Sequence, residues 1–127
     1  MNASLTDGVN LLSKLNNRRL WNFTKLVAGY FASKLSGRTI LLGNPSSLSV
    51  EPTTSCNLRC PQCPSGLREF SRNTGMLGID LYKKIIDETH HELIWLVLYF
   101  QGEPFLNKQF LEFVRYASQK KIYTATS

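Results

Sequence analysis

Cysteine is missing from most of this 127-residue chain, and that scarcity is informative. All three cysteines, Cys56, Cys60 and Cys63, fall within eight residues, and the rest of the sequence has none. A disulfide framework normally uses an even number of cysteines at spread positions. The distribution therefore excludes a disulfide-stapled protein and indicates a metal centre instead.

Long hydrophobic runs are also missing. No uninterrupted apolar stretch approaches the roughly 18 residues that a membrane-spanning helix needs, which excludes a transmembrane segment. The N-terminus has Asp7 and Asn10 where a secretory signal would have basic residues leading into an apolar stretch. We therefore expect a cytoplasmic protein. With 43% hydrophobic residues, the chain has enough apolar material for one small packed domain.

Acidic residues are scarce in the first third of the chain. Residues 1–44 hold six basic residues against Asp7 alone, whereas residues 45–127 hold nine basic and eight acidic residues. The net charge of +6 therefore describes an N-terminal segment and not a basic domain. This distribution gives no whole-protein case for nucleic-acid binding, and no nucleic-acid partner is expected.

Residues 1–44 are expected to form a basic helical segment and a linker. Apolar residues recur there at the spacing of one helix face, namely Leu20, Phe23, Val27, Tyr30 and Phe31. The basic residues lie largely off that stripe. The favoured interpretation is that the helix packs on the following domain with its charges in solvent. The alternative is that it lies on an anionic membrane surface or docks on a partner.

Residues 45–127 alternate between strand and helix patterns. Strands are predicted at 48–51, 93–100 and 122–126, and helices at 79–89 and from Asn107 as an N-cap. The run 93–100 is apolar on both faces, which is typical of a strand buried on two sides of a parallel sheet. This order predicts βαβ winding with right-handed crossovers. Because the chain stops within the third strand, we expect a fragment of a longer α/β barrel.

The cysteines lie on a compact loop, CNLRCPQC, with C-x3-C-x2-C spacing. Pro61 and Pro64 argue against a strand or a helix there. Thiolates suit iron–sulfur clusters and zinc, and three local thiols would leave one iron of a [4Fe–4S] cube open for catalysis. A zinc site that recruits His90 or His91, and a redox pair formed by two of the thiols, are the alternatives.

A second motif identifies the family that the sequence resembles. Gln101-Gly102-Glu103-Pro104 directly follows the apolar strand pattern and resembles the GGEP motif of the radical S-adenosylmethionine (radical SAM) superfamily. The CNLRCPQC loop resembles that superfamily's cysteine loop. The resemblance covers residues 48–127 and is greatest to the branch with a C-terminal SPASM domain. It implies the N-terminal portion of a partial radical SAM barrel in residues 45–127.

The resemblance also implies a mechanism and a set of roles. Cys56, Cys60 and Cys63 would ligate a [4Fe–4S] cluster, and S-adenosylmethionine would chelate the open iron. Reductive cleavage would give a 5′-deoxyadenosyl radical that takes hydrogen from a substrate, either a small molecule or a peptide or protein side chain. Gly102 and Glu103 would meet the methionine amino group, and the Gln62 backbone would contact adenine. Flavodoxin or ferredoxin would donate the electron.

The alternative function, from a different class, is a non-catalytic structural module that binds zinc or an iron–sulfur cluster through the three thiols.

Three arginines flank the cysteine loop, and each is interpreted as a solvated loop charge; they are Arg59, Arg68 and Arg72.

Overall fold

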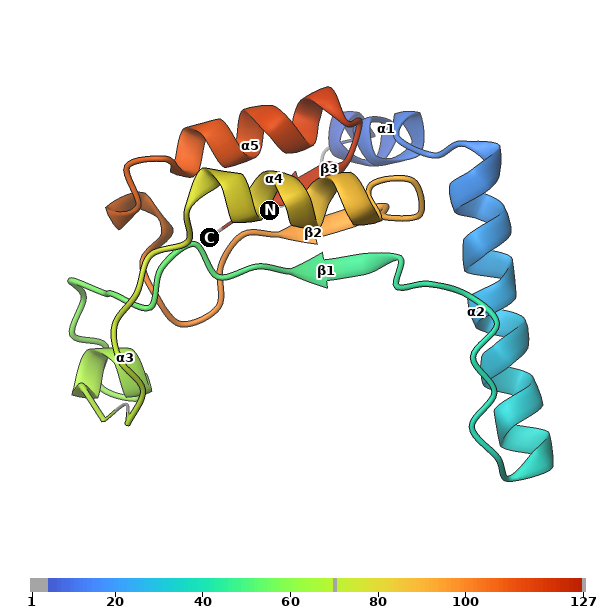
Figure 1. The fold of residues 1–127 in the computed structure, drawn as a ribbon, viewed down its shortest axis with the longest axis horizontal. Helices are drawn as coiled ribbons and strands as arrows, with labels where there is room; N and C mark the ends of the chain where they lie inside the picture. Colours follow the sequence, from blue (N-terminus) through green and yellow to red (C-terminus); the bar gives the residue numbers. More distant parts are fainter. Residues whose placement is uncertain (1–4, 70, 127) are drawn as a thin grey trace.

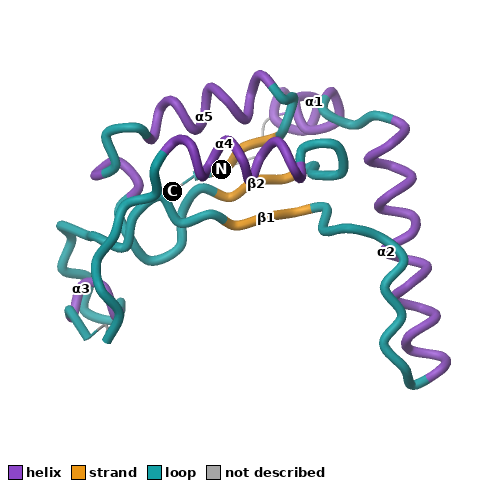
Figure 2. The backbone as a smooth tube through the Cα atoms, in the orientation of Figure 1, coloured by secondary structure: helices purple, strands orange, loops and turns teal. Residues whose placement is uncertain are grey.

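A computed structural model describes residues 5–69 and 71–126, and it contains a three-stranded parallel sheet (Figure 1). The strands lie in the order β1 (Ser47–Ser49), β2 (Trp95–Val97), β3 (Tyr123–Ala125). Helices α4 (Ile79–Thr89) and α5 (Phe110–Gln119) connect them and lie on one face of the sheet (Figure 2). The predicted α/β winding with parallel strands is confirmed, and the predicted helix 79–89 has the observed bounds.

The strands are shorter than predicted, although backbone pairing continues past their ends. The Val50 N–H donates to the Val97 carbonyl at 2.8 Å, and the Leu98 N–H donates to the Ala125 carbonyl at 2.9 Å. The expectation that the second strand is buried on both faces is wrong within the described residues. Leu96 and Leu98 are buried under the helices, but Trp95 is only half-buried. The reason is that α4 and α5 cover the same face, and no described layer covers the other.

The core lies between the sheet and the two helices. Its centre is the stack of the Tyr82 ring from α4 on the Phe113 ring from α5, with centroids 4.3 Å apart. The Tyr82 hydroxyl donates to the Phe113 carbonyl at 2.9 Å, which satisfies the one polar atom of that side chain. The fully or nearly fully buried apolar residues are Val50, Tyr82, Ile86, Leu93, Leu96, Leu98, Phe110, Phe113, Ala117 and Ile122.

Asn107 lies outside the N-cap position that was predicted for it, and its side chain has a wider role. Helix α5 begins at Phe110, and Gln109 occupies its N-cap position without a side-chain hydrogen bond. The Asn107 side-chain oxygen still accepts from the Gln109 N–H at 2.9 Å, just before the helix. Its buried amide nitrogen donates to the carbonyls of Pro52 at 2.7 Å and Leu77 at 3.0 Å. It therefore joins three segments that are far apart in the sequence, which a local capping pattern does not reveal.

Two short elements begin with proline, although proline was expected to exclude helices from the cysteine loop. These are α3 (Pro64–Leu67) and the 3₁₀ helix η1 (Pro104–Leu106). Proline is tolerated in the first turn of a helix, because its missing N–H would have no partner there and its φ angle is already helical. The two turns lie in or beside the two motifs of the sequence.

The N-terminal segment contains two helices, α1 (Leu5–Ser13) and α2 (Asn17–Ser36). Helix α2 was expected to pack its apolar stripe on the domain, and this expectation is wrong. The buried residues of α2 are Arg19, Asn22 and Gly29, whereas the stripe from Leu20 to Phe31 is exposed. None of the helices in the described ranges has the length and hydrophobicity to cross a membrane. A domain boundary between residues 44 and 45 stays a prediction.

Candidate functional site

The cysteine loop leaves the carboxyl end of β1 and forms a lobe around α3, at the far end of the molecule from α2 (Figure 1). All three thiols are free, with Cys60 exposed and the other two half-buried. The Cys63 N–H donates to the Cys60 carbonyl at 3.2 Å, and this turn fixes two of the cysteines relative to each other. Gly66 lies directly on the Cys60 backbone, because a Cβ at Gly66 would be 2.5 Å from its nitrogen and oxygen.

Cys63 is in an environment that favours the thiolate. The backbone N–H groups of Gly66 and Ser65 hold the pKa of the Cys63 thiol below its usual value, and the Ser65 hydroxyl adds to this effect. A thiolate is the form that binds soft metals and iron–sulfur clusters. Three free thiols on one short loop are thus a suitable donor set for a cluster.

The three cysteine side chains are nevertheless not close enough together to form a metal site. Across residues 5–69 and 71–126, no three His, Cys, Asp or Glu side chains lie close enough together to hold a metal ion. The assignment of the cysteines as cluster ligands therefore remains a prediction based on their chemistry and spacing. His90 and His91 follow the end of α4, at the amino edge of the sheet, whereas the cysteines lie beyond its carboxyl edge (Figure 1). This separation gives no support to a zinc site that combines the cysteines with His90 or His91.

The second motif reaches the cysteine loop through backbone contacts. Gly102 lies against the segment before Cys56, because an ideal Cβ there would be 1.7 Å from the Thr53 carbonyl oxygen. The Glu103 N–H donates to the Ser55 carbonyl at 2.8 Å, and the Ser65 hydroxyl donates to the Gln101 carbonyl at 2.6 Å. The structure thus brings the two motifs together at the carboxyl edge of the sheet, where the parallel winding predicts that they meet.

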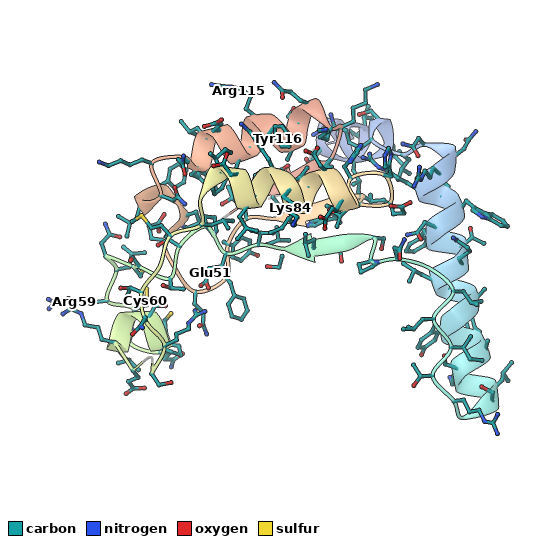
Figure 3. The ribbon with its side chains drawn as sticks, in the orientation of Figure 1. Glu51, Arg59, Cys60, Lys84, Arg115 and Tyr116 are labelled. Carbon is teal, nitrogen blue, oxygen red and sulfur yellow. The ribbon has the colours of Figure 1, made fainter. Side chains whose placement is uncertain are left out.

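Glu51 anchors the second motif from the end of β1, and the sequence analysis missed it (Figure 3). Its Oε1 accepts from the N–H groups of Gln101 and Gly102, both at 3.1 Å. Its Oε2 pairs with the Arg72 guanidinium at 3.0 Å, and Arg72 also donates to the Gln101 side-chain oxygen at 3.3 Å. The interpretation of Arg72 as a solvated charge is therefore wrong. The available signal was a carboxylate at the end of the predicted strand 48–51.

Glu103 and Gln62 are the two other residues for which ligand contacts were predicted. The Glu103 carboxylate accepts from the Phe105 N–H at 3.3 Å and caps η1. Gln62 is exposed within the turn between Cys60 and Cys63. Arg59 points outward from the lobe (Figure 3). The structure places Glu103 beside the loop but leaves the predicted ligand contacts of both residues as predictions.

A pocket of about 300 Å³ adjoins the cysteine loop. Hydroxyl groups, one thiol and two guanidinium groups surround it, and this combination suits a polar ligand that carries a carboxylate. Its lining residues are Thr54, Ser55, Cys56, Ser65, Arg68, Arg72 and Thr74.

Comparison with known proteins gives two relatives by sequence. The chain is 33% identical over 82 residues to "PqqA peptide cyclase" from Rhodopseudomonas palustris, covering 65% of this chain and 22% of the relative. It is equally similar over 82 residues to "PqqA peptide cyclase" from Bradyrhizobium diazoefficiens, covering 21% of that protein. The chain thus spans about a fifth of the length of these relatives. No protein-family model matches it.

One solved structure supports the fold. The chain superposes on "BtrN in complex with AdoMet and 2-DOIA" with a TM-score of 0.52 and 24% sequence identity. The superposition covers 64% of this chain and 34% of BtrN. The parallel sheet and its helices therefore correspond to part of a larger barrel.

Proposed function

Because this chain belongs to the radical SAM superfamily, we propose that it is part of an enzyme that cleaves S-adenosylmethionine reductively at a [4Fe–4S] cluster. The observation that carries the proposal is the backbone contact of Gly102 with Thr53, which joins the cysteine loop to the second motif. Cys56, Cys60 and Cys63 are the proposed cluster ligands. When bound, the reduced cluster and S-adenosylmethionine together supply a 5′-deoxyadenosyl radical that takes a hydrogen atom from the substrate.

The chain's own residues bind and orient the cofactor in this proposal. The N–H and carbonyl groups around Gly102 and Glu103 are the proposed partners of the methionine amino group. Glu51 holds the backbone of this motif in position, since its carboxylate accepts from the consecutive N–H groups of Gln101 and Gly102. The Gln62 backbone is the proposed contact of adenine. The adjoining pocket supplies hydroxyl and guanidinium groups for a carboxylate.

The proposal also includes the class of substrate, the electron donor and the cellular location of the enzyme. The names of the two relatives refer to a peptide, PqqA, and this supports a peptide or protein side chain as the substrate. AdoMet in the BtrN complex supports S-adenosylmethionine as the cofactor. We further propose flavodoxin or ferredoxin as the electron donor, a cytoplasmic location, and a SPASM-like extension in the protein that contains this chain.

The reaction class is tested on the protein that contains this chain. After anaerobic iron–sulfur reconstitution and reduction with dithionite, we expect 5′-deoxyadenosine to form from added S-adenosylmethionine, as measured by liquid chromatography. Omission of dithionite is the control. A colourless, zinc-loaded protein that leaves S-adenosylmethionine intact would contradict the proposal and favour a structural metal module.

Replacing Glu51 by alanine is expected to raise the KM for S-adenosylmethionine roughly tenfold or more, because hydrogen bonds to a charged acceptor contribute about 1.5–3 kcal/mol each. Iron content should stay unchanged, since Glu51 lies outside the cysteine loop. Glu51→Gln keeps an acceptor oxygen and is expected to lose less. Glu88→Ala, on the exposed surface of α4, is the matched control. An unchanged KM in Glu51→Ala would show that Glu51 does not position the turn.

A further inference from the structure

Helix α2 is attached to the body of the protein by its polar side. The buried Arg19 guanidinium donates to the carbonyls of His90 at 2.9 Å and Lys120 at 3.1 Å, and also to those of Lys14 and Lys121. The Asn22 side chain donates to the Asn44 carbonyl at 2.8 Å and accepts from the Asn44 N–H at 2.9 Å. These bonds fix which side of the helix faces the protein.

The opposite side of α2 is apolar and exposed, and we call it the outer face. In Figure 1 the helix stands away from the sheet, and a backbone segment runs back along it toward β1. Residue spacing of three and four places the outer residues over about half of the helix circumference, at 100° per residue. They are between 39% and 88% exposed and comprise Leu20, Trp21, Phe23, Val27, Tyr30, Phe31 and Leu35.

The charge around the outer face has one sign. No Asp or Glu occurs between residues 8 and 50. Lys25 follows Trp21 by four residues and Lys34 follows Tyr30 by four, so each lysine lies beside an aromatic ring on the helix surface. Arg38 follows just past the C-cap at Gly37. The surface that complements this face is therefore both anionic and apolar.

A membrane interface meets these requirements better than a protein groove. Helices that dock in grooves present a narrow apolar stripe, whereas the apolar residues of α2 spread over about half of its circumference. Tryptophan and tyrosine prefer the boundary between lipid headgroups and acyl chains, and lysine beside them can reach anionic headgroups. We propose that the outer face of α2 binds the surface of an anionic membrane, with the helix lying in the plane of the interface.

This geometry leaves the candidate metal centre accessible. The cysteine lobe and α2 lie at opposite ends of the molecule in Figure 1, so a membrane on the outer face does not cover the cysteines. The inference is independent of the proposed chemistry, because it uses neither the cluster nor S-adenosylmethionine.

The test is flotation of the protein that contains this chain with phosphatidylcholine vesicles, with or without about one-third phosphatidylglycerol. We expect binding to the anionic vesicles, weaker binding at high salt, and little binding to neutral vesicles. The double substitution Trp21→Ser and Phe31→Ser is expected to weaken binding at least tenfold. Leu111→Ser changes an equally exposed apolar residue on α5 and should bind like the wild type.

Charge is tested separately. Lys25→Glu with Lys34→Glu should weaken vesicle binding at least tenfold, whereas Lys84→Glu, on the exposed surface of α4, should not. Failure of the wild type to bind anionic vesicles at low salt would overturn the proposal. In that case analytical ultracentrifugation identifies the occupant. A dimer that the Trp21 and Phe31 substitutions dissociate would show that a second copy covers the face, and an unchanged mass would indicate another protein segment.

Discussion

Replacing any one of Cys56, Cys60 and Cys63 by alanine is expected to abolish cluster-dependent cleavage of S-adenosylmethionine. Each thiol is proposed to hold one iron, and the chain has no other cysteine that could replace it. Iron and sulfide per chain should fall steeply after reconstitution, together with the visible charge-transfer absorption. Formation of 5′-deoxyadenosine should fall to the level of the unreduced control.

A matched variant in the same loop distinguishes the loss of a cluster ligand from a general disruption of the loop structure. Leu58 lies between the first two cysteines and is 52% exposed, so Leu58→Ala should retain iron and activity. The three cysteine substitutions should have equal effects on cleavage, although Cys60 is exposed and the other two are half-buried. A single alanine variant that keeps full iron content and full cleavage would contradict the assignment of that residue as a ligand.

Replacing Gly102 by alanine is expected to lower kcat/KM for S-adenosylmethionine on the order of a hundredfold, because a displacement of about 1 Å can have that effect on a positioned reaction. The added Cβ would lie 1.7 Å from the Thr53 carbonyl oxygen and 2.7 Å from its carbonyl carbon. Neither atom can move without moving the backbone. The shift would break the bonds from Glu103 to Ser55 and from Gly102 to Glu51.

The control for this prediction is Gly78→Ala. An added Cβ at Gly78 meets nothing within 4 Å, and its φ of −83° suits any residue. Activity should therefore match the wild type, with at most a small loss of thermal stability because Gly78 is the N-cap of α4. Iron content should survive in Gly102→Ala, since the cysteine loop itself is unchanged. A Gly102→Ala variant with a wild-type KM for S-adenosylmethionine would show that the tight contact has no role in cofactor binding.

The sequence was sufficient to predict the parallel winding, and the winding accounts for the meeting of the two motifs in the structure. Periodicity located the helix 79–89, and parallel strands bring their carboxyl ends, and hence both motifs, to one edge of the sheet. Glu51 was not predicted because its partners at Gln101 and Gly102 are 50 and 51 residues away. Local patterns carry no information on contacts at such separations.

The prediction of how α2 is oriented was wrong for a related reason. The spacing of Leu20, Phe23 and Val27 correctly predicted a helix, but the assumption that an apolar stripe faces the body was wrong. The orientation depends on Arg19, whose partners include carbonyls 71 and 101 residues along the chain. A buried arginine is rare enough that a sequence pattern gives no reason to expect one.

The bonds of Arg19 have a consequence for the order in which the chain folds. The carbonyls of Lys120 and Lys121 are synthesised 101 and 102 residues after Arg19, and they become available only when α5 and β3 have formed. Helix α2 is therefore expected to stay unattached until the chain has been synthesised as far as Lys121, because contacts of such large sequence separation form late. Attachment of the N-terminal segment therefore reports that α5 and β3 have formed.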